Sequence, residues 1–157
     1  MEYDVRIVEA GAERIAAVRA RVRRGTIGQA FRGPLDKVWD FLRRHPGLRS
    51  DGHNLFLYEH ATSDTTFLTV DFGVQVVSAF DSEGEVRCLQ TPSGEAASTL
   101  HRGPYEQLPA AHAALHQWCK RYGRRIGGFS WEVYGDWAND PNLLETTILY
   151  LLEPVVP

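Results

Sequence analysis

A repeated order of residues is the feature that most limits the folds open to this chain. The order Arg-Gly, Trp, Tyr occurs twice, at Arg24-Gly25, Trp39 and Tyr58, and again at Arg102-Gly103, Trp118 and Tyr134. The Gly-to-Trp gaps are 14 and 15 residues, and the Trp-to-Tyr gaps are 19 and 16. A repeat of about 75 residues is typical of two similar half-domains packed together. Coincidence is the alternative, because the gaps differ.

The length of the chain fits this arrangement. With 157 residues it has the size of one ordinary domain, or of two small halves that share a core. Its 43% hydrophobic and 24% charged residues are ordinary for a folded protein and exclude an intrinsically disordered chain. We therefore predict one domain over residues 1–157, with half-modules at about 1–80 and 81–157, and a ligand groove where they meet.

Charge and composition exclude several classes of protein. The net charge of -3 does not suit nucleic-acid binding, and the arginines of segment 19–24 alternate with Ala20 and Val22, as on the solvent face of a strand. No apolar run is long enough for a signal peptide or a membrane span. Cys88 and Cys119 lack metal-type spacing, which suits a reducing compartment. We predict a cytoplasmic protein without nucleic-acid or membrane partners.

Hydrophobic periodicity predicts few helices and many strands. Helices are expected at about 35–45, before Pro46, and at about 105–122, before Gly123. Strands are expected at 5–8, 14–23 (with a helix as the alternative there), 55–60, 66–77, 86–89, 96–100, 129–134 and 144–152. Each half then runs strand, helix, strand, strand, with an additional strand near its start. The predicted fold class is α+β, an antiparallel sheet with helices on one face.

Most catalytic motifs are absent from the sequence. It contains no P-loop, dinucleotide glycine fingerprint, nucleophile elbow or HExxH, so no cofactor is predicted. His112 and His116 share one helix face, but a third ligand cannot be placed beside them. We expect a half-exposed pair of histidines and no metal site.

The segment 131–134, Trp-Glu-Val-Tyr, is the sharpest local signal. On a strand, Glu132 and Tyr134 point to one side, while Trp131 and Val133 point to the other. A buried Glu132 would have a raised pKa and would attract cations or transfer protons. A solvent-facing Glu132 paired with a surface arginine is the alternative, and strand spacing alone favours it.

The repeat extends this site to the first half. It makes Phe56 and Tyr58 the counterparts of Glu132 and Tyr134, which predicts one acidic and one aromatic wall. Three further aromatic residues are candidates for either core or pocket wall: Trp39 on the first helix, and Phe72 and Tyr150 at matching places on the long strands.

At this point the residues resemble a known family. The run Ala97, His101 to Glu106, Leu115, Trp118, Gly123, Trp131 to Tyr134, Asp140-Pro141 and Thr146 to Pro154 resembles the GyrI-like small-molecule-binding domain. This domain is also the effector-binding domain of AraC-type and MerR-type transcription regulators. The resemblance is strong from about 92 to 154, and weaker but consistent over the first half.

The resemblance implies two β-α-β-β modules related by a pseudo-twofold axis, with a central ligand groove between them. It implies that Glu132 is the acidic residue that contacts cationic aromatic drugs in the regulator members, and that Glu106 is structural. Some stand-alone members are similar to hydrolases that open cyclopropane rings. We expect a stand-alone member here, because a helix-turn-helix domain has no room in this chain.

We therefore expect a protein that binds hydrophobic or cationic aromatic small molecules, with catalysis and simple binding both open. As an enzyme it would use Glu132 as general base or proton donor and Tyr134 as hydrogen-bond donor. The expected pocket walls are Trp39, Phe56, Tyr58, Phe72, Trp131 and Tyr150, although strand alternation turns Trp131 away. The alternatives are a non-catalytic protein that sequesters cationic drugs, and an acidic surface that contacts gyrase. The ligand and the choice between monomer and dimer stay open.

Overall fold

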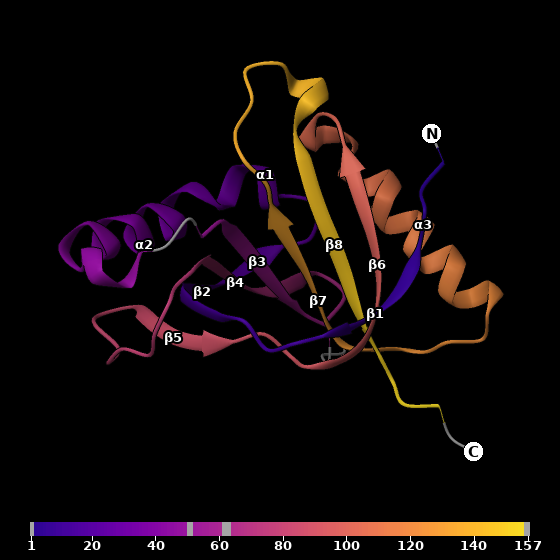
Figure 1. Cartoon of the computed structure of the whole chain (residues 1–157), viewed down its shortest axis with the longest axis horizontal. Helices are drawn as coiled ribbons and strands as arrows, with labels where there is room; N and C mark the ends of the chain where they lie inside the picture. Colours follow the sequence, from indigo (N-terminus) through magenta and orange to yellow (C-terminus); the bar gives the residue numbers. More distant parts are fainter. Residues whose placement is uncertain (1, 50–51, 61–63, 156–157) are drawn as a thin grey trace.

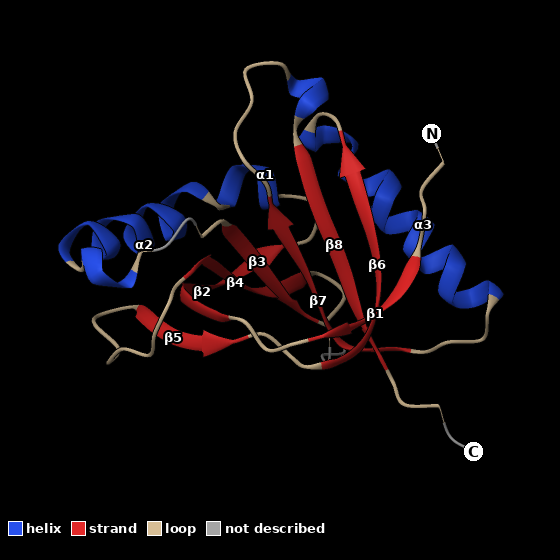
Figure 2. Cartoon of the chain, in the orientation of Figure 1, coloured by secondary structure: helices blue, strands red, loops and turns tan. Residues whose placement is uncertain are grey.

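The computed structural model describes residues 2–49, 52–60 and 64–155, and its strands form one antiparallel sheet (Figure 2). The strands are β1 (Arg6–Ala10), β2 (Arg14–Arg23), β3 (Asn54–Glu59), β4 (Phe67–Gln75), β5 (Val86–Gln90), β6 (Gly94–Arg102), β7 (Ile126–Tyr134) and β8 (Glu145–Leu152). The helices are α1 (Ile27–Ala30), α2 (Arg32–Arg44) and α3 (Leu108–Arg121), with short 3-10 turns at Pro46–Leu48, Tyr105–Gln107 and Pro141–Leu143. The predicted α+β class is confirmed.

The order of strands across the sheet is symmetric. It runs β1-β6-β8-β7-β3-β4-β2-β5, so β3 and β7 lie side by side in the middle (Figure 1). When the order is reversed, β1 changes places with β5, β6 with β2, β8 with β4, and β7 with β3. The modules are β2-α2-β3-β4 and β6-α3-β7-β8. The strand that precedes each module pairs with the first strand of the other module: β1 pairs with β6, and β5 pairs with β2.

Pairing registers link the residues of each half across its strands. Phe72 of β4 lies opposite Val18 of β2, and Tyr150 of β8 lies opposite Ala97 of β6. Val18 in turn pairs with β5, as Ala97 pairs with β1. Phe72 and Tyr150 thus lie on corresponding strands, each on the face covered by the helices.

The same registers show that two of the predicted correspondences conflict. Phe56 lies opposite Phe72, whereas Glu132 lies opposite Ile148. A match of Phe56 with Glu132 therefore pairs Phe72 with Ile148 and not with Tyr150. The two predictions differ by two positions along the strands, because residue spacing was counted through helices and loops of unequal length.

Each main helix covers one half of the same sheet face (Figures 1 and 2). Apolar residues recur three or four positions apart on both helices and make the buried stripe. On α2 they are Leu35, Val38, Phe41 and Leu42, and on α3 they are Leu108, Ala111, Leu115 and Cys119. The helix α2 ends before Pro46, and Gly123 takes the positive φ of 65° that follows α3. Both helix ends agree with the sequence prediction.

The opposite sheet face has a core of its own. Its buried residues, among them Ile15, Leu55 and Trp131, form a cluster that contains no helical residue. Strand alternation assigns them to this face, since their chain neighbours lie in the clusters beneath α2 and α3.

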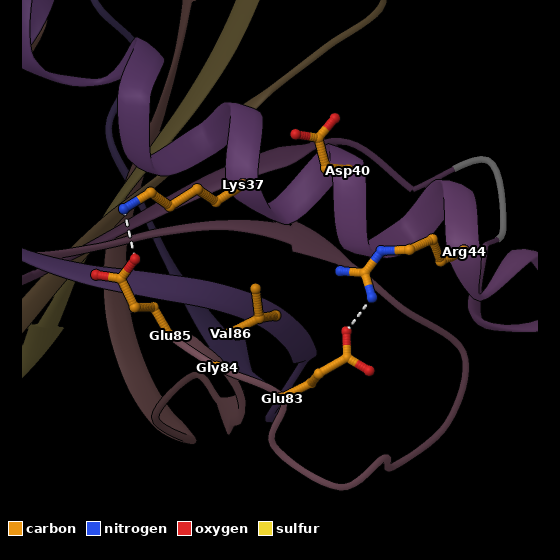
Figure 3. A pocket seen from close by; sticks show the side chains of 7 residues that line it. All are labelled: Lys37, Asp40, Arg44, Glu83, Gly84, Glu85 and Val86. Atoms are coloured by element: carbon orange, nitrogen blue, oxygen red, sulfur yellow. Dashed lines mark hydrogen bonds and ion pairs between the residues drawn. The ribbon is translucent and has the colours of Figure 1, made fainter.

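Ion pairs attach α2 to the turn before β5. Lys37 pairs with Glu85 and Arg44 pairs with Glu83 across a shallow hollow (Figure 3). These side chains are largely exposed, so each pair contributes little to stability. In the described part of the chain, no helix is long and apolar enough to cross a membrane.

Candidate functional site

Glu132 lies beside the centre of the sheet, on the face covered by the helices. It is 4% exposed, so the interpretation of a solvent-facing residue paired with a surface arginine is wrong. Glu132 lies opposite Phe56 in the pairing of β7 with β3, which is where the two halves meet. Tyr134, two residues further along β7, packs against the cores beneath both α2 and α3.

Hydroxyl groups and one imidazole satisfy the Glu132 carboxylate. Oε1 accepts a hydrogen bond from the Tyr58 hydroxyl and another, of 2.7 Å, from the Tyr134 hydroxyl. Oε2 lies 2.7 Å from Nε2 of His112, whose Nδ1 lies 2.7 Å from the Tyr150 hydroxyl. Side chains from β3, β7 and α3 therefore contact one carboxylate, and Tyr150 of β8 joins the network through His112.

The network decides the charge of Glu132. Burial raises its pKa, but the hydrogen bond and electrostatic interaction with His112, together with the hydroxyls of Tyr58 and Tyr134, lower the pKa below its ordinary value. The expectation of a raised pKa for a buried Glu132 is therefore wrong, because these partners outweigh burial, and Glu132 is an anion. Burial, and then the charge of Glu132, raise the pKa of Tyr58 and of Tyr134 well above the ordinary value. Both tyrosines stay protonated and donate.

A row of rings joins the two halves at this site. The Phe56 ring lies 4.8 Å from the Tyr134 ring, which lies 5.5 Å from the Tyr105 ring. On the side of α2, Phe56 lies 6.0 Å from Phe31 and 4.8 Å from Phe72, edge to face. Of these residues, Tyr134 donates to the carboxylate and Phe56 lies opposite Glu132 across β3 and β7. Glu132 is 4% exposed, so a ligand can contact its carboxylate only after neighbouring side chains move.

The predicted wall residues do not all share one surface. Phe72 is fully buried in the core beneath α2. Trp39 is half-buried at the edge of that core, and its Nε1 donates to Oδ1 of Asn54 over 3.2 Å. Trp131 belongs to the cluster on the other sheet face and is 2% exposed. The inclusion of Trp131 is corrected, because strand alternation keeps it on the side of the sheet away from Glu132.

Sequence reasoning missed the role of His112. It was expected as one of two half-exposed histidines, yet it contacts both Glu132 and Tyr150. The available signal was its place next to Ala111 on the buried stripe of α3, facing the sheet. Its neighbour His116 is exposed, and its ring lies 4.9 Å from the Tyr150 ring.

A second histidine contact lies beside the network. Nε2 of His60 is 2.6 Å from Oγ of Ser130, and its ring stacks on Tyr150 at 5.9 Å. Burial, and then the charges of Arg24, His116 and His112, lower the pKa of His60 to about 4. His60 is therefore neutral at pH 7. The described residues contain no group of three or more His, Cys, Asp or Glu that could hold a metal ion.

Comparison with known proteins agrees with this architecture. The family model of the GyrI-like small molecule binding domain matches residues 3–152. The chain belongs to the GyrI-like family. The resemblance seen in the sequence is thereby confirmed. No curated protein sequence matched the chain.

Solved structures share the GyrI-like fold. The crystal structure of the EcmrR C-terminal domain is 22% identical, with a TM-score of 0.82 over 99% of this chain and 100% of that one. In an EcmrR–DNA complex, the match covers 98% of this chain and 58% of that one, with 21% identity and a TM-score of 0.81. A hydrolase from Listeria innocua is 13% identical (TM-score 0.63, 95% of this chain and 91% of that one). SAV2435 bound to tetraphenylphosphonium is 12% identical (TM-score 0.63, 98% and 94%). At these identities the likeness shows the fold.

Proposed function

We propose that this GyrI-like protein binds hydrophobic aromatic cations at Glu132, between α2 and α3. The observation that carries the proposal is a buried, ionised carboxylate whose hydrogen-bond partners are two tyrosine hydroxyls and one histidine. In the described residues, its only ion-pair partner is His112. A cation that enters the site would meet an anion without a lysine or arginine to neutralise it.

The surrounding rings suit the same ligand. Phe56, Tyr58 and Tyr134 are aromatic, and aromatic faces attract a cation while they bury its apolar groups. Tyr150 would complete the wall on the side of α3. A relative with the same fold, SAV2435, has been solved with tetraphenylphosphonium, a cation that carries four phenyl rings. This likeness supports the class of ligand, and the residues of this chain supply the contacts.

The test is a calorimetric titration with tetraphenylphosphonium, compared with triphenylphosphine oxide as a neutral analogue. The wild type should bind the cation more tightly. Glu132→Gln should weaken cation binding by about 2 kcal/mol, or roughly thirtyfold, because a desolvated charge partner is lost. It should leave binding of the neutral analogue nearly unchanged. The exposed acid Glu95, which pairs with Arg124, offers Glu95→Gln as the matched control.

Equal affinity of the wild type and Glu132→Gln for the cation would contradict the proposal. A protein that acts by contacting gyrase through its acidic surface would behave in this way, because it would not use the buried carboxylate.

The contact between Glu132 and His112 supports a second candidate, hydrolysis of an electrophilic small molecule such as a cyclopropane-containing compound. Glu132 or His112 would take a proton from water. The water oxygen would form a bond to a ring carbon, the strained carbon–carbon bond would break, and the released electron pair would be protonated. The lowered pKa of Glu132 makes its carboxylate a weak base. Such a reaction would detoxify the compound.

Mass analysis after incubation with a cyclopropane-containing compound distinguishes the two candidates. An enzyme would add one water to the compound, and Glu132→Gln would bind the compound but stop the conversion. A protein that only binds would return the compound unchanged.

A further inference from the structure

We propose a second small-molecule site, on the sheet face opposite Glu132, that takes a flat aromatic cation. A hollow of about 460 Å³ lies at the ends of β6, β7 and β8. Ligand pockets have volumes of about 300–1,000 Å³, so it can accept a molecule of two or three rings. Val133 and Thr147, which pair across β7 and β8, contribute to its lining. Val133 adjoins Glu132 in the chain and therefore faces the other side of the sheet.

Exposed apolar side chains gather at this hollow. Leu100 is 48% exposed, Leu143 is 62% exposed and Trp137 is 74% exposed. They are three of the seven large hydrophobic side chains that are exposed in the described part of the chain, and all three line one hollow. Such a gathering indicates a binding surface, whereas single exposed hydrophobic residues are ordinary.

Acidic groups give the hollow its preference for positive charge. The carboxylates of Asp136 and Glu145 lie on its lining, next to Trp137. Asp136 contacts His53, and Glu145 contacts Arg102 at 3.4 Å, but both carboxylates remain open to solvent. A ring that lies on the Trp137 indole would therefore place a positive charge beside them.

The loop that carries Trp137 is attached at both ends. Gly135 donates its backbone N–H to the Glu145 carbonyl at 2.8 Å, so the β7–β8 pairing continues to this point. At the other end, the backbone N–H of Gly103 donates to the Leu144 carbonyl at 2.8 Å, just before β8. Figure 1 shows this loop rising beyond the ends of β7 and β8. Both ends of the loop are therefore attached to the sheet, and Trp137 is one of the residues that line the hollow.

The two sites are separable because they lie on opposite faces of β7. Tyr134 is the residue they share, since it contributes to the lining of the hollow while its hydroxyl donates to Glu132. The second site rests on the hollow and on Trp137, so it does not require the proposed function of Glu132.

N-Methylquinolinium, with neutral quinoline as the shape-matched control, tests the second site in nuclear magnetic resonance titrations at pH 7.5. The Trp137 indole signal, identified by its loss in Trp137→Phe, should shift on addition of millimolar probe. The cation should bind about threefold more tightly than quinoline, because the exposed carboxylates of Asp136 and Glu145 attract its charge. The double variant Asp136→Asn, Glu145→Gln should lose that preference.

Variants show which face of the sheet binds the probe. Trp137→Ala should weaken binding about tenfold, because a tryptophan anchor is removed. Tyr122→Ala, which removes another exposed ring at the end of α3, should not weaken it. Glu132→Gln should leave the shift of the Trp137 signal intact. The proposal is overturned if the probe shifts only signals near Tyr58, or if Trp137→Ala binds the probe as tightly as the wild type does. It is also overturned if the Trp137 signal changes with protein concentration alone, because a second copy of the chain would then cover the hollow.

Discussion

The two halves share one frame but differ in what they place beneath the helix. When the buried stripes are aligned, the apolar residues match in the pairs Leu35 and Leu108, Val38 and Ala111, Leu42 and Leu115. The position directly after Val38 and Ala111 holds Trp39 in the first half and His112 in the second. Trp39 hydrogen-bonds Asn54 at the edge of its core, whereas His112 hydrogen-bonds the buried Glu132.

The strands repeat this contrast. On the face covered by the helices, β3 and β4 contribute Tyr58 and Phe72, whereas β7 and β8 contribute Glu132 and Tyr150. The first half therefore supplies a close-packed apolar support, and the second half supplies most of the polar groups of the site. Burying a charged carboxylate costs free energy unless polar groups bond it. Here one half supplies most of these polar groups, while the other half keeps an apolar core.

The largest expected effect tests the apolar character of the first half. Phe72→Ala should lower the free energy of unfolding by about 3–5 kcal/mol, since it opens a cavity in a fully buried core. Tyr150→Phe, on β8 of the second half, should cost about 1 kcal/mol, because it removes one hydrogen bond to His112. Urea denaturation measures both, with Val77→Ala as the exposed control. Equal costs would break the contrast between the halves.

A smaller effect tests the polar character of the second half. His112→Leu should lower the free energy of unfolding by about 2–3 kcal/mol, because it leaves Oε2 of the buried Glu132 carboxylate without its partner. Trp39→Phe, at the aligned position on α2, should cost only about 1 kcal/mol through the bond to Asn54. The control is His116→Leu, which changes an exposed histidine one turn further along the same face of α3. A His112→Leu protein as stable as the wild type would show that His112 does not support the carboxylate.

The smallest expected effect concerns pH. The pKa of His60 is about 4 in the folded protein against an ordinary 6.5, so the unfolded chain binds more protons between these values. Stability should therefore be complete above pH 6.5 and fall as the pH decreases to about 4. After allowance for solvent screening, the loss should be roughly 1–2 kcal/mol. Unfolding measured from pH 7 to pH 4 should show a shallower fall in His60→Gln. An identical fall in both proteins would mean that His60 titrates normally.

Much of the fold could be predicted because its signals are local. The stripe Leu35, Val38 and Leu42 has helical spacing, and Pro46 ends that helix whatever lies around it. Alternation along segment 131–134 correctly separated Glu132 and Tyr134 from Trp131. These patterns depend on residues a few positions apart, so the sequence displays them directly.

The site could be predicted only in part. The sequence placed Glu132 and Tyr134 on one face of a strand, but it did not show that Tyr58 donates to Glu132, because that contact depends on the register between β3 and β7. His112 was expected to be half-exposed beside His116, whereas its partner Glu132 lies 20 positions away in the chain. No local pattern reports such a contact.

By itself the sequence determined the α+β class, the duplicated strand–helix–strand–strand order and the strand that carries the acidic residue, because periodicity and turn residues act over short distances. Only the tertiary structure decided that Glu132 is buried and charged. Its pKa is a balance between the loss of water and the donors that arrive from β3, β7 and α3, and that balance exists only once these elements have packed together.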